Sequence, residues 1–232
     1  MSEDGKSYRQ ILRSTSIIGG ATVINILIGL VRVKMVAVLL GPAGVGLIGL
    51  FSSLIATASS VAALGMGTVG TRQIAEAAGR DDPQAIAVAR RALFWGTLAM
   101  AVLGAWAFWL LRGLLAEHVL ADSTLSDEVG WLALGIGLTV AAGSQLALLN
   151  GLRRIGDLAR ISVYSAMLAT VLGVGALLLW GEQGLLVYLL LTPVSSFVVG
   201  LWYVNRLPKS GREPSEVLEY SGVGYREILA AV

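Results

Sequence analysis

The chain has 232 residues, of which 56% are hydrophobic and only 14% are charged, and its mean hydropathy is +0.77. This composition excludes an ordinary soluble domain and indicates a membrane protein. The formal net charge of +2 gives no sign of a nucleic-acid-binding surface, and the absence of cysteine excludes disulfides and thiolate metal sites.

Six stretches are each apolar over the roughly 20 residues that a helix needs to cross about 30 Å of hydrocarbon. In chain order they cover residues 17–40, 43–70, 92–111, 129–152, 161–181 and 183–205. The expected fold class is therefore an all-α polytopic membrane protein with six transmembrane helices. Its expected parts are a cytoplasmic N-terminal segment (1–13), a transmembrane lobe (14–206), and a cytoplasmic linker or start of a second lobe (207–232).

The first stretch follows a basic segment, as the apolar region of a secretory signal peptide does. However, Arg32 and Lys34 stand where a small-residue cleavage site is required. We therefore predict an uncleaved first transmembrane helix.

The distribution of Lys and Arg predicts the orientation, because short basic connections stay in the cytoplasm. Fourteen of the 17 basic residues lie before the first stretch or on alternate connections: Lys6, Arg9, Arg13, Arg72, Arg80, Arg90, Arg91, Arg153, Arg154, Arg160, Arg206, Lys209, Arg212 and Arg226. The opposite connections hold Arg112 and are otherwise uncharged or acidic. Both termini are expected in the cytoplasm.

Local signals predict several helix ends. Gly41-Pro42 is typical of a tight outer hairpin between the first two helices, and we also consider it a candidate hinge. Asp82-Pro83 is typical of an N-cap followed by proline at the first helical position, and Gly79 is expected to end a short helix before it.

Pro193 lies well inside the last stretch and is expected to kink that helix, because proline removes an intrahelical hydrogen bond. The kink serves either packing or the motion of a gating helix. The 29 glycines allow the same two interpretations, close helix packing or conformational looseness.

Arg32 is the most informative residue, because it lies roughly 22 Å along the first helix from Ile17 and hence in the outer half of the membrane. An ionised group at such depth normally faces a bundle interior or a wet cavity. Thr22, Asn25 and Arg32 share one helical face, which predicts a polar cavity wall that binds substrate. The alternative is snorkelling or a salt bridge to another helix.

Lys34 is two residues further along and therefore about 200° around the helix, on an apolar side. It is a second candidate for substrate binding, and snorkelling to the outer headgroups is the alternative.

No stretch contains Asp, Glu or His, so the chain offers no obvious site for a coupling ion. The only histidine, His118, lies in an acidic outer connection. No nucleophile, base or metal cluster can be assembled, so the chain is not expected to be an enzyme or to hold a cofactor or metal.

Three segments carry a family resemblance: residues 39–47 (LLGPAGVGL), 65–72 (GMGTVGTR) and 149–159 (LNGLRRIGDLA). In this order and at these places in the topology, the chain resembles the Wzx-type polysaccharide flippases, O-antigen translocases of the multidrug/oligosaccharidyl-lipid/polysaccharide exporter superfamily. By its distance from Gly41, the basic residue of the family's first helix matches Lys34 better than Arg32.

The resemblance implies two six-helix lobes around a cavity in a bacterial inner membrane. It implies that an isoprenoid-pyrophosphate-linked glycan is moved from the cytoplasmic to the outer leaflet by alternating access. Arg32 and Lys34 would then bind pyrophosphate, and the prenyl tail would stay in membrane lipid. The chain is expected to supply one lobe, either as a truncated product or as half of an assembly with a second lobe, a homodimer partner or a glycan polymerase. A drug exporter of the same superfamily and a non-transporting membrane scaffold are the alternatives.

Overall fold

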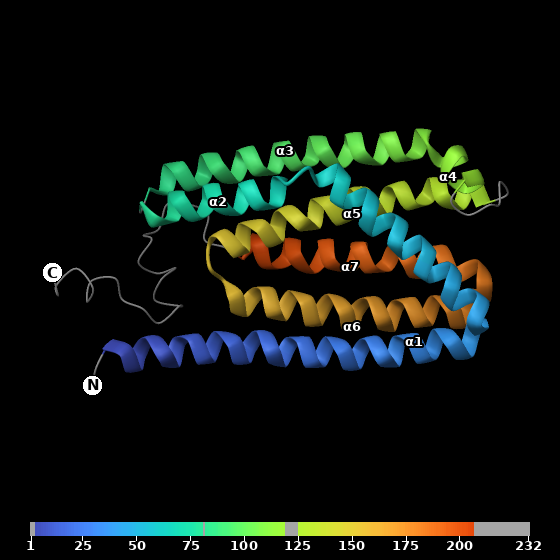
Figure 1. Cartoon of the computed structure of the whole chain (residues 1–232), viewed down its shortest axis with the longest axis horizontal. Coiled ribbons are helices and arrows are strands. Elements are labelled where there is room, and N and C mark those ends of the chain that lie inside the picture. Colours follow the sequence, from blue (N-terminus) through green and yellow to red (C-terminus); the bar gives the residue numbers. More distant parts are fainter. Residues whose placement is uncertain (1–2, 81, 119–124, 207–232) are drawn as a thin grey trace.

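The computed structural model describes residues 3–80, 82–118 and 125–206, and within these ranges the chain is helical, without strands (Figure 1). Its elements are α1 (Glu3–Ala63), α2 (Met66–Gly79), α3 (Pro83–Leu110), α4 (Arg112–His118), α5 (Ser126–Gly151), α6 (Ile155–Trp180), the short 3₁₀ turn η2 (Gly181–Gly184) and α7 (Leu185–Asn205). The all-α part of the predicted fold class is confirmed. The predicted segment 207–232 lies outside the described residues.

Four helical segments are long and apolar enough to cross a membrane: Ser16–Ala63, Gln84–Leu110, Ser126–Gly151 and Ile155–Asn205. The first and the last of these span 48 and 51 residues, about twice the length that one crossing requires. Each of these two long segments folds back on itself, at Gly41 and at η2 respectively (Figure 1).

The bend within α1 is made by one residue. Gly41 has φ 66° and ψ −174°, and helical geometry resumes at Pro42. Glycine reaches a positive φ without the steric cost that a Cβ atom brings, and proline is suited to a first helical position. The predicted change of direction at Gly41-Pro42 is therefore confirmed, as a sharp bend between two helical halves.

The predicted second stretch, residues 43–70, is not one helix. α1 ends at Ala63, Leu64 and Gly65 both have positive φ, and α2 begins at Met66. Figure 1 shows α2 continuing from the second half of α1 towards the end of the bundle where α1 starts. The error arose because the apolar residues run through the break without any polar interruption. The short helix expected before Gly79 is the last part of α2.

The start of α3 is as predicted. The carboxylate of Asp82 accepts hydrogen bonds from the backbone N–H groups of Gln84 and Ala85, at 2.9 and 3.0 Å, and Pro83 follows it directly. Two backbone donors that have no intrahelical partner are thereby satisfied. Gly79 ends α2, also as predicted.

α5 is the central helix, and it packs against α1, α2, α3 and α7. Leu132, Ile136 and Leu149 on α5 are fully buried. The first half of α1 is the opposite case, because ten large apolar side chains between Ile17 and Val38 are exposed. Such an outward surface suits contact with lipid.

Glycines allow close approach at some helix contacts. A Cβ on Gly151 of α5 would meet Ile74 of α2 at 2.7 Å, and one on Gly173 of α6 would meet Tyr188 of α7 at 2.8 Å. Others, such as Gly46, have nothing within 4 Å. Close packing therefore explains some of the glycines and leaves others without a structural reason.

The two ends of the bundle differ in charge. One end holds the α2–α3 and α5–α6 connections and the C-terminus of α7 (Figure 1), with the basic residues Arg80, Arg153, Arg154 and Arg206 on or next to them. The other end holds the Gly41 bend, α4 and η2. The connections predicted to share a side of the membrane thus lie at the same end of the bundle.

Candidate functional site

Arg32 reaches from α1 to α7. Its Nε donates a hydrogen bond to the hydroxyl of Tyr188 at 2.6 Å, and its Nη2 donates to Oγ1 of Thr192 at 2.7 Å. The guanidinium carbon also lies 4.5 Å from the centroid of the Tyr188 ring, within the range of a cation–π interaction. The half-buried side chain is therefore held in a defined place between two helices.

The sequence of α7 explains how it receives Arg32. Tyr188 and Thr192 are four residues apart and so lie on one face of the helix, close to its start at Leu185. The Tyr188 ring is buried and lies against the backbone of Gly173 in α6. Because the ring has no room to turn away, its hydroxyl is presented to α1.

A second polar contact joins α1 to α6. The Nδ2 of Asn25 donates a hydrogen bond to Oγ of Ser162 at 2.7 Å. Asn25 and Arg32 are seven residues apart, which places them on one face about 10 Å from each other. The Oδ1 of Asn25 is buried and accepts no hydrogen bond from a described residue.

The charge of Arg32 has no acidic partner in the part of the chain that the structure describes. The ion pairs there join Arg72 to Glu76, and Asp157 to both Arg154 and Arg160. Arginine has five N–H donors, and the two hydroxyls use two of them. The guanidinium thus keeps its full charge and has donors left for a further acceptor.

The structure brings together some of the predicted site residues and separates others. Asn25 and Arg32 both face α6 and α7, whereas Lys34 is exposed on another side of α1. Thr22 is exposed, and its hydroxyl bonds to the carbonyl oxygen of Ile18 in its own helix, at 2.9 Å. Substrate binding by Arg32, Lys34, Asn25 or Thr22 stays a prediction.

Of the predicted hinges, Gly41 and Pro42 form the bend in α1, and Pro193 is buried within α7. α7 remains one helix from Leu185 to Asn205 through Pro193. A gating motion at either place stays a prediction.

Sequence reasoning missed Ser162, Tyr188 and Thr192, the partners of the polar residues on α1. The signal was present, since Tyr188 and Thr192 are four apart and are the polar residues of the run 185–194. What the sequence could not provide was which helix packs beside the first.

Comparison with known proteins adds one match. A family model described as polysaccharide biosynthesis protein covers residues 11–209, most of the chain. The chain belongs to the polysaccharide biosynthesis protein family. No curated protein and no solved structure matches it. The match covers the described helices from residue 11 of α1 to the end of α7, so Arg32 and its partners lie within the family region.

Proposed function

We propose that this member of the polysaccharide biosynthesis family flips a lipid-linked oligosaccharide, such as an O-antigen or polysaccharide repeat unit, from the cytoplasmic to the outer leaflet. The observation that carries the proposal is the charge of Arg32, which lies within an apolar span and has hydroxyl but no carboxylate partners among the described residues. An ionised group inside a membrane is costly and commonly marks a substrate or ion pathway. The resemblance to Wzx-type flippases supports the same substrate class.

The membrane topology belongs to this proposal. It has six crossings, with both termini in the cytoplasm of a bacterial cell. The bends at Gly41 and η2, which divide the two longest apolar segments, support the number of crossings, and the distribution of Lys and Arg supports the orientation. Residues 14–206 would form one lobe, and a second lobe or a second copy would complete the cavity. A glycan polymerase is the expected partner for the product.

The role of Arg32 would be to bind the pyrophosphate electrostatically. A planar guanidinium can hold two oxygens of a pyrophosphate at once, and it stays charged away from water. Hydroxyl partners suit this role, because they orient the guanidinium without neutralising it. The prenyl tail would remain in lipid, and no covalent bond would be made or broken, so the protein would act as a transporter and not as an enzyme.

The test is flipping of a tagged lipid-linked glycan by the assembled transporter in proteoliposomes. Arg32→Ala should abolish flipping, and Arg32→Lys should restore only part of it, because lysine keeps the charge but loses the two-pronged geometry. Lys34→Ala is the matched control and should retain most activity. Full transport by well-folded Arg32→Ala protein would remove Arg32 from the mechanism.

A non-transporting scaffold is the second candidate, and one observation favours it: the hydrogen bonds of Asn25 and Arg32 join α1 to α6 and α7. If this joining were their whole role, Arg32→Gln would lower stability while transport per folded molecule stayed unchanged. Measuring both quantities on the same samples separates the two functions.

A further inference from the structure

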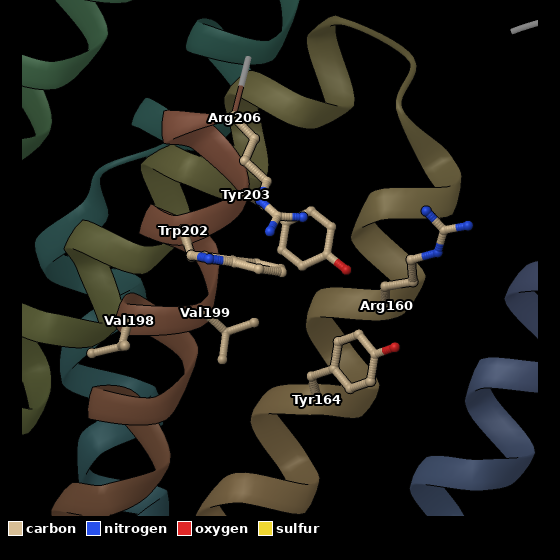
Figure 2. Close-up of a pocket in the computed structure, with 7 residues that line it drawn as sticks. All are labelled: Arg160, Tyr164, Val198, Val199, Trp202, Tyr203 and Arg206. Atoms are coloured by element: carbon tan, nitrogen blue, oxygen red, sulfur yellow. The ribbon is translucent and has the colours of Figure 1, made fainter. Parts of the chain in front are cut away.

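A second polar site lies between α6 and α7, at the basic end of the bundle and away from Arg32. An open groove of about 720 Å³ lies between the two helices, and Figure 2 shows the side chains that line it. Its lining consists of Arg160 and Tyr164 from α6 and of Val198, Val199, Trp202, Tyr203 and Arg206 from α7. A volume of this size is typical of a small-molecule site.

Arg206 is positioned at the rim of this groove. It caps the C-terminus of α7, where a positive charge is favourable, and its guanidinium carbon lies 3.4 Å from the centroid of the Trp202 ring. Trp202 in turn meets the ring of Tyr203 edge to face, with 5.0 Å between the centroids. No carboxylate among the described residues pairs with Arg206, so its N–H groups remain available to bind an anion.

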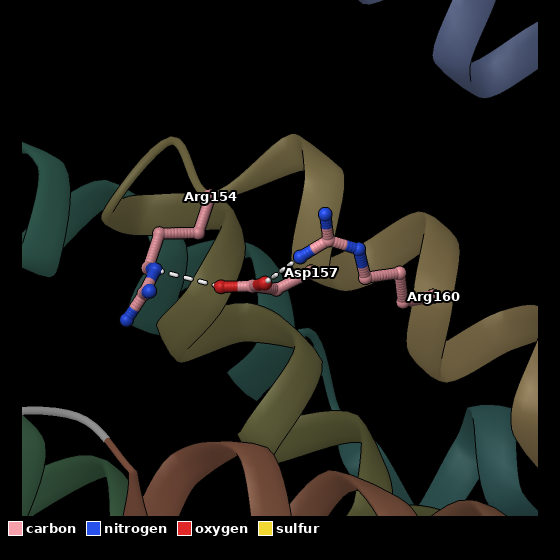
Figure 3. Close-up of polar contacts among 3 residues, drawn as sticks. All are labelled: Arg154, Asp157 and Arg160. Atoms are coloured by element: carbon pink, nitrogen blue, oxygen red, sulfur yellow. Dashed lines mark hydrogen bonds and ion pairs between the residues drawn. The ribbon is translucent and has the colours of Figure 1, made fainter. Parts of the chain in front are cut away.

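Arg160 is positioned on the opposite wall and is only partly neutralised. The carboxylate of Asp157 lies 2.7 Å from Arg154 and 3.4 Å from Arg160, and Figure 3 shows it between the two arginines. Arg154 is the closer partner of Asp157, so Arg160 is paired more weakly, and its side chain is 65% exposed. The three residues together carry one excess positive charge, and Arg206 adds a second.

The groove changes from charged to apolar along its length. Arg206 is at the end of α7, whereas Val198 and Val199 are about 10 Å deeper along the helix. On α6, the aromatic ring of Tyr164 is likewise one turn deeper than Arg160. A soluble anion needs only the charged end, whereas a membrane lipid matches both, with its phosphate at the arginines and its acyl chain along the valines.

We infer that this groove binds the phosphate headgroup of an anionic membrane phospholipid. Basic pockets between transmembrane helices are suited to such headgroups, and tryptophan and tyrosine are favoured at the same depth. The inference is independent of glycan flipping, because it uses none of the Arg32 contacts. The two arginines would hold the phosphate oxygens, and the Tyr164 and Tyr203 hydroxyls would supply further hydrogen-bond donors.

The test uses the full chain in phosphatidylcholine vesicles that contain increasing amounts of brominated phosphatidylglycerol, whose bromine quenches nearby tryptophan. Trp202→Phe, subtracted from the wild type, isolates the signal of Trp202 among the six tryptophans. We expect this signal to saturate at a low fraction of anionic lipid. Arg160→Gln with Arg206→Gln should raise the half-saturating fraction by about thirtyfold, which corresponds to about 1 kcal/mol for each arginine.

The matched control removes the same charge outside the groove. Arg80→Gln with Arg91→Gln, both exposed in the basic half of the bundle, should leave the half-saturating fraction within about twofold of the wild type. Arg160→Gln alone leaves the Arg206–Trp202 contact in place and should still weaken binding. Arg160→Lys with Arg206→Lys should retain most of it.

Quenching that never saturates, or an equal shift in the control, would overturn the inference in favour of general surface charge. Displacement of the lipid by excess inorganic phosphate would show a soluble-anion site. Binding of lipid-linked glycan diphosphate without phosphatidylglycerol would make the groove part of the substrate path. Either of the last two outcomes also contradicts the inference.

Discussion

Arg32 and Tyr188, 156 positions apart in the chain, are joined twice: the guanidinium Nε lies 2.6 Å from the phenol oxygen, and the guanidinium carbon lies 4.5 Å from the ring centroid. The ring supplies a negative π face and the hydroxyl supplies a lone pair, so one side chain meets the cation in two ways. Neither interaction neutralises the charge. The pair therefore fixes the position of Arg32 and leaves its charge uncompensated.

Tyr188→Phe should lower the free energy of unfolding by about 1 kcal/mol, because it removes the hydroxyl that accepts from Arg32 and keeps the ring. Tyr164→Phe is the matched control, since the Tyr164 hydroxyl bonds to no described residue, and it should be nearly neutral. Unfolding in mixed detergent micelles measures both changes. A double-mutant cycle with Arg32→Gln that gave no coupling energy would contradict the interaction.

Gly173→Ala should destabilise the bundle by about 1–3 kcal/mol, because the added methyl group would lie 2.8 Å from Cδ2 of the buried Tyr188 ring. Gly175→Ala, in the same helix, has open space around the new methyl group and should be neutral or stabilising. Thermal unfolding of both variants provides the comparison. Equal effects would mean that helix propensity, and not contact with Tyr188, decides the outcome.

The exposed ion pair between Arg72 and Glu76 on α2 should make stability depend on pH. The hydrogen bond from Arg72 and then its charge hold the pKa of Glu76 below its ordinary 4.5, and Arg80 adds a smaller effect. Because the folded pKa is the lower one, the pair's contribution to stability is complete above the unfolded pKa and is lost as pH falls through the folded pKa. Arg72→Gln should raise the Glu76 pKa measured by NMR titration, and Arg80→Gln should raise it less. An equal rise in both variants would refute the hydrogen bond as the main cause.

The proposed topology can be tested with single cysteines, because the chain has none of its own. Cysteines at Arg80 and Arg154 should be protected from an impermeant reagent in intact cells, whereas one at Glu182 in η2 should react. Permeabilised cells give the control for reactivity. Labelling at Arg80 in intact cells would reverse the proposed orientation.

The lengths of the apolar stretches and the residues that start, end or bend helices predicted most of the helices. The Asp82-Pro83 start, the Gly79 end and the Gly41 bend were all visible in the sequence, because each depends on the backbone preferences of one or two residues. The break at Gly65 was missed for the opposite reason. Glycine is common within membrane helices, and only the left-handed backbone at Leu64 and Gly65 distinguishes a break from close packing.

The candidate site was only half predictable. Depth and helical face singled out Arg32 and Asn25, because both follow from position in one helix. Their partners Tyr188, Thr192 and Ser162 lie far away in the chain, and no periodicity reveals which helices pack together. The groove between α6 and α7 was missed because its basic residues were assigned only to topology.

The bend at Gly41 also determines where the chain resists cutting. A protease needs a segment that it can bind in extended form, and exposed loop tips usually supply one. Between the two halves of α1 only Gly41 departs from helical geometry, so this turn presents no such segment. Limited proteolysis of the folded protein should leave the peptide from Ser16 to Ala63 intact, and a short flexible insert after Gly41 should create a cleavage site there.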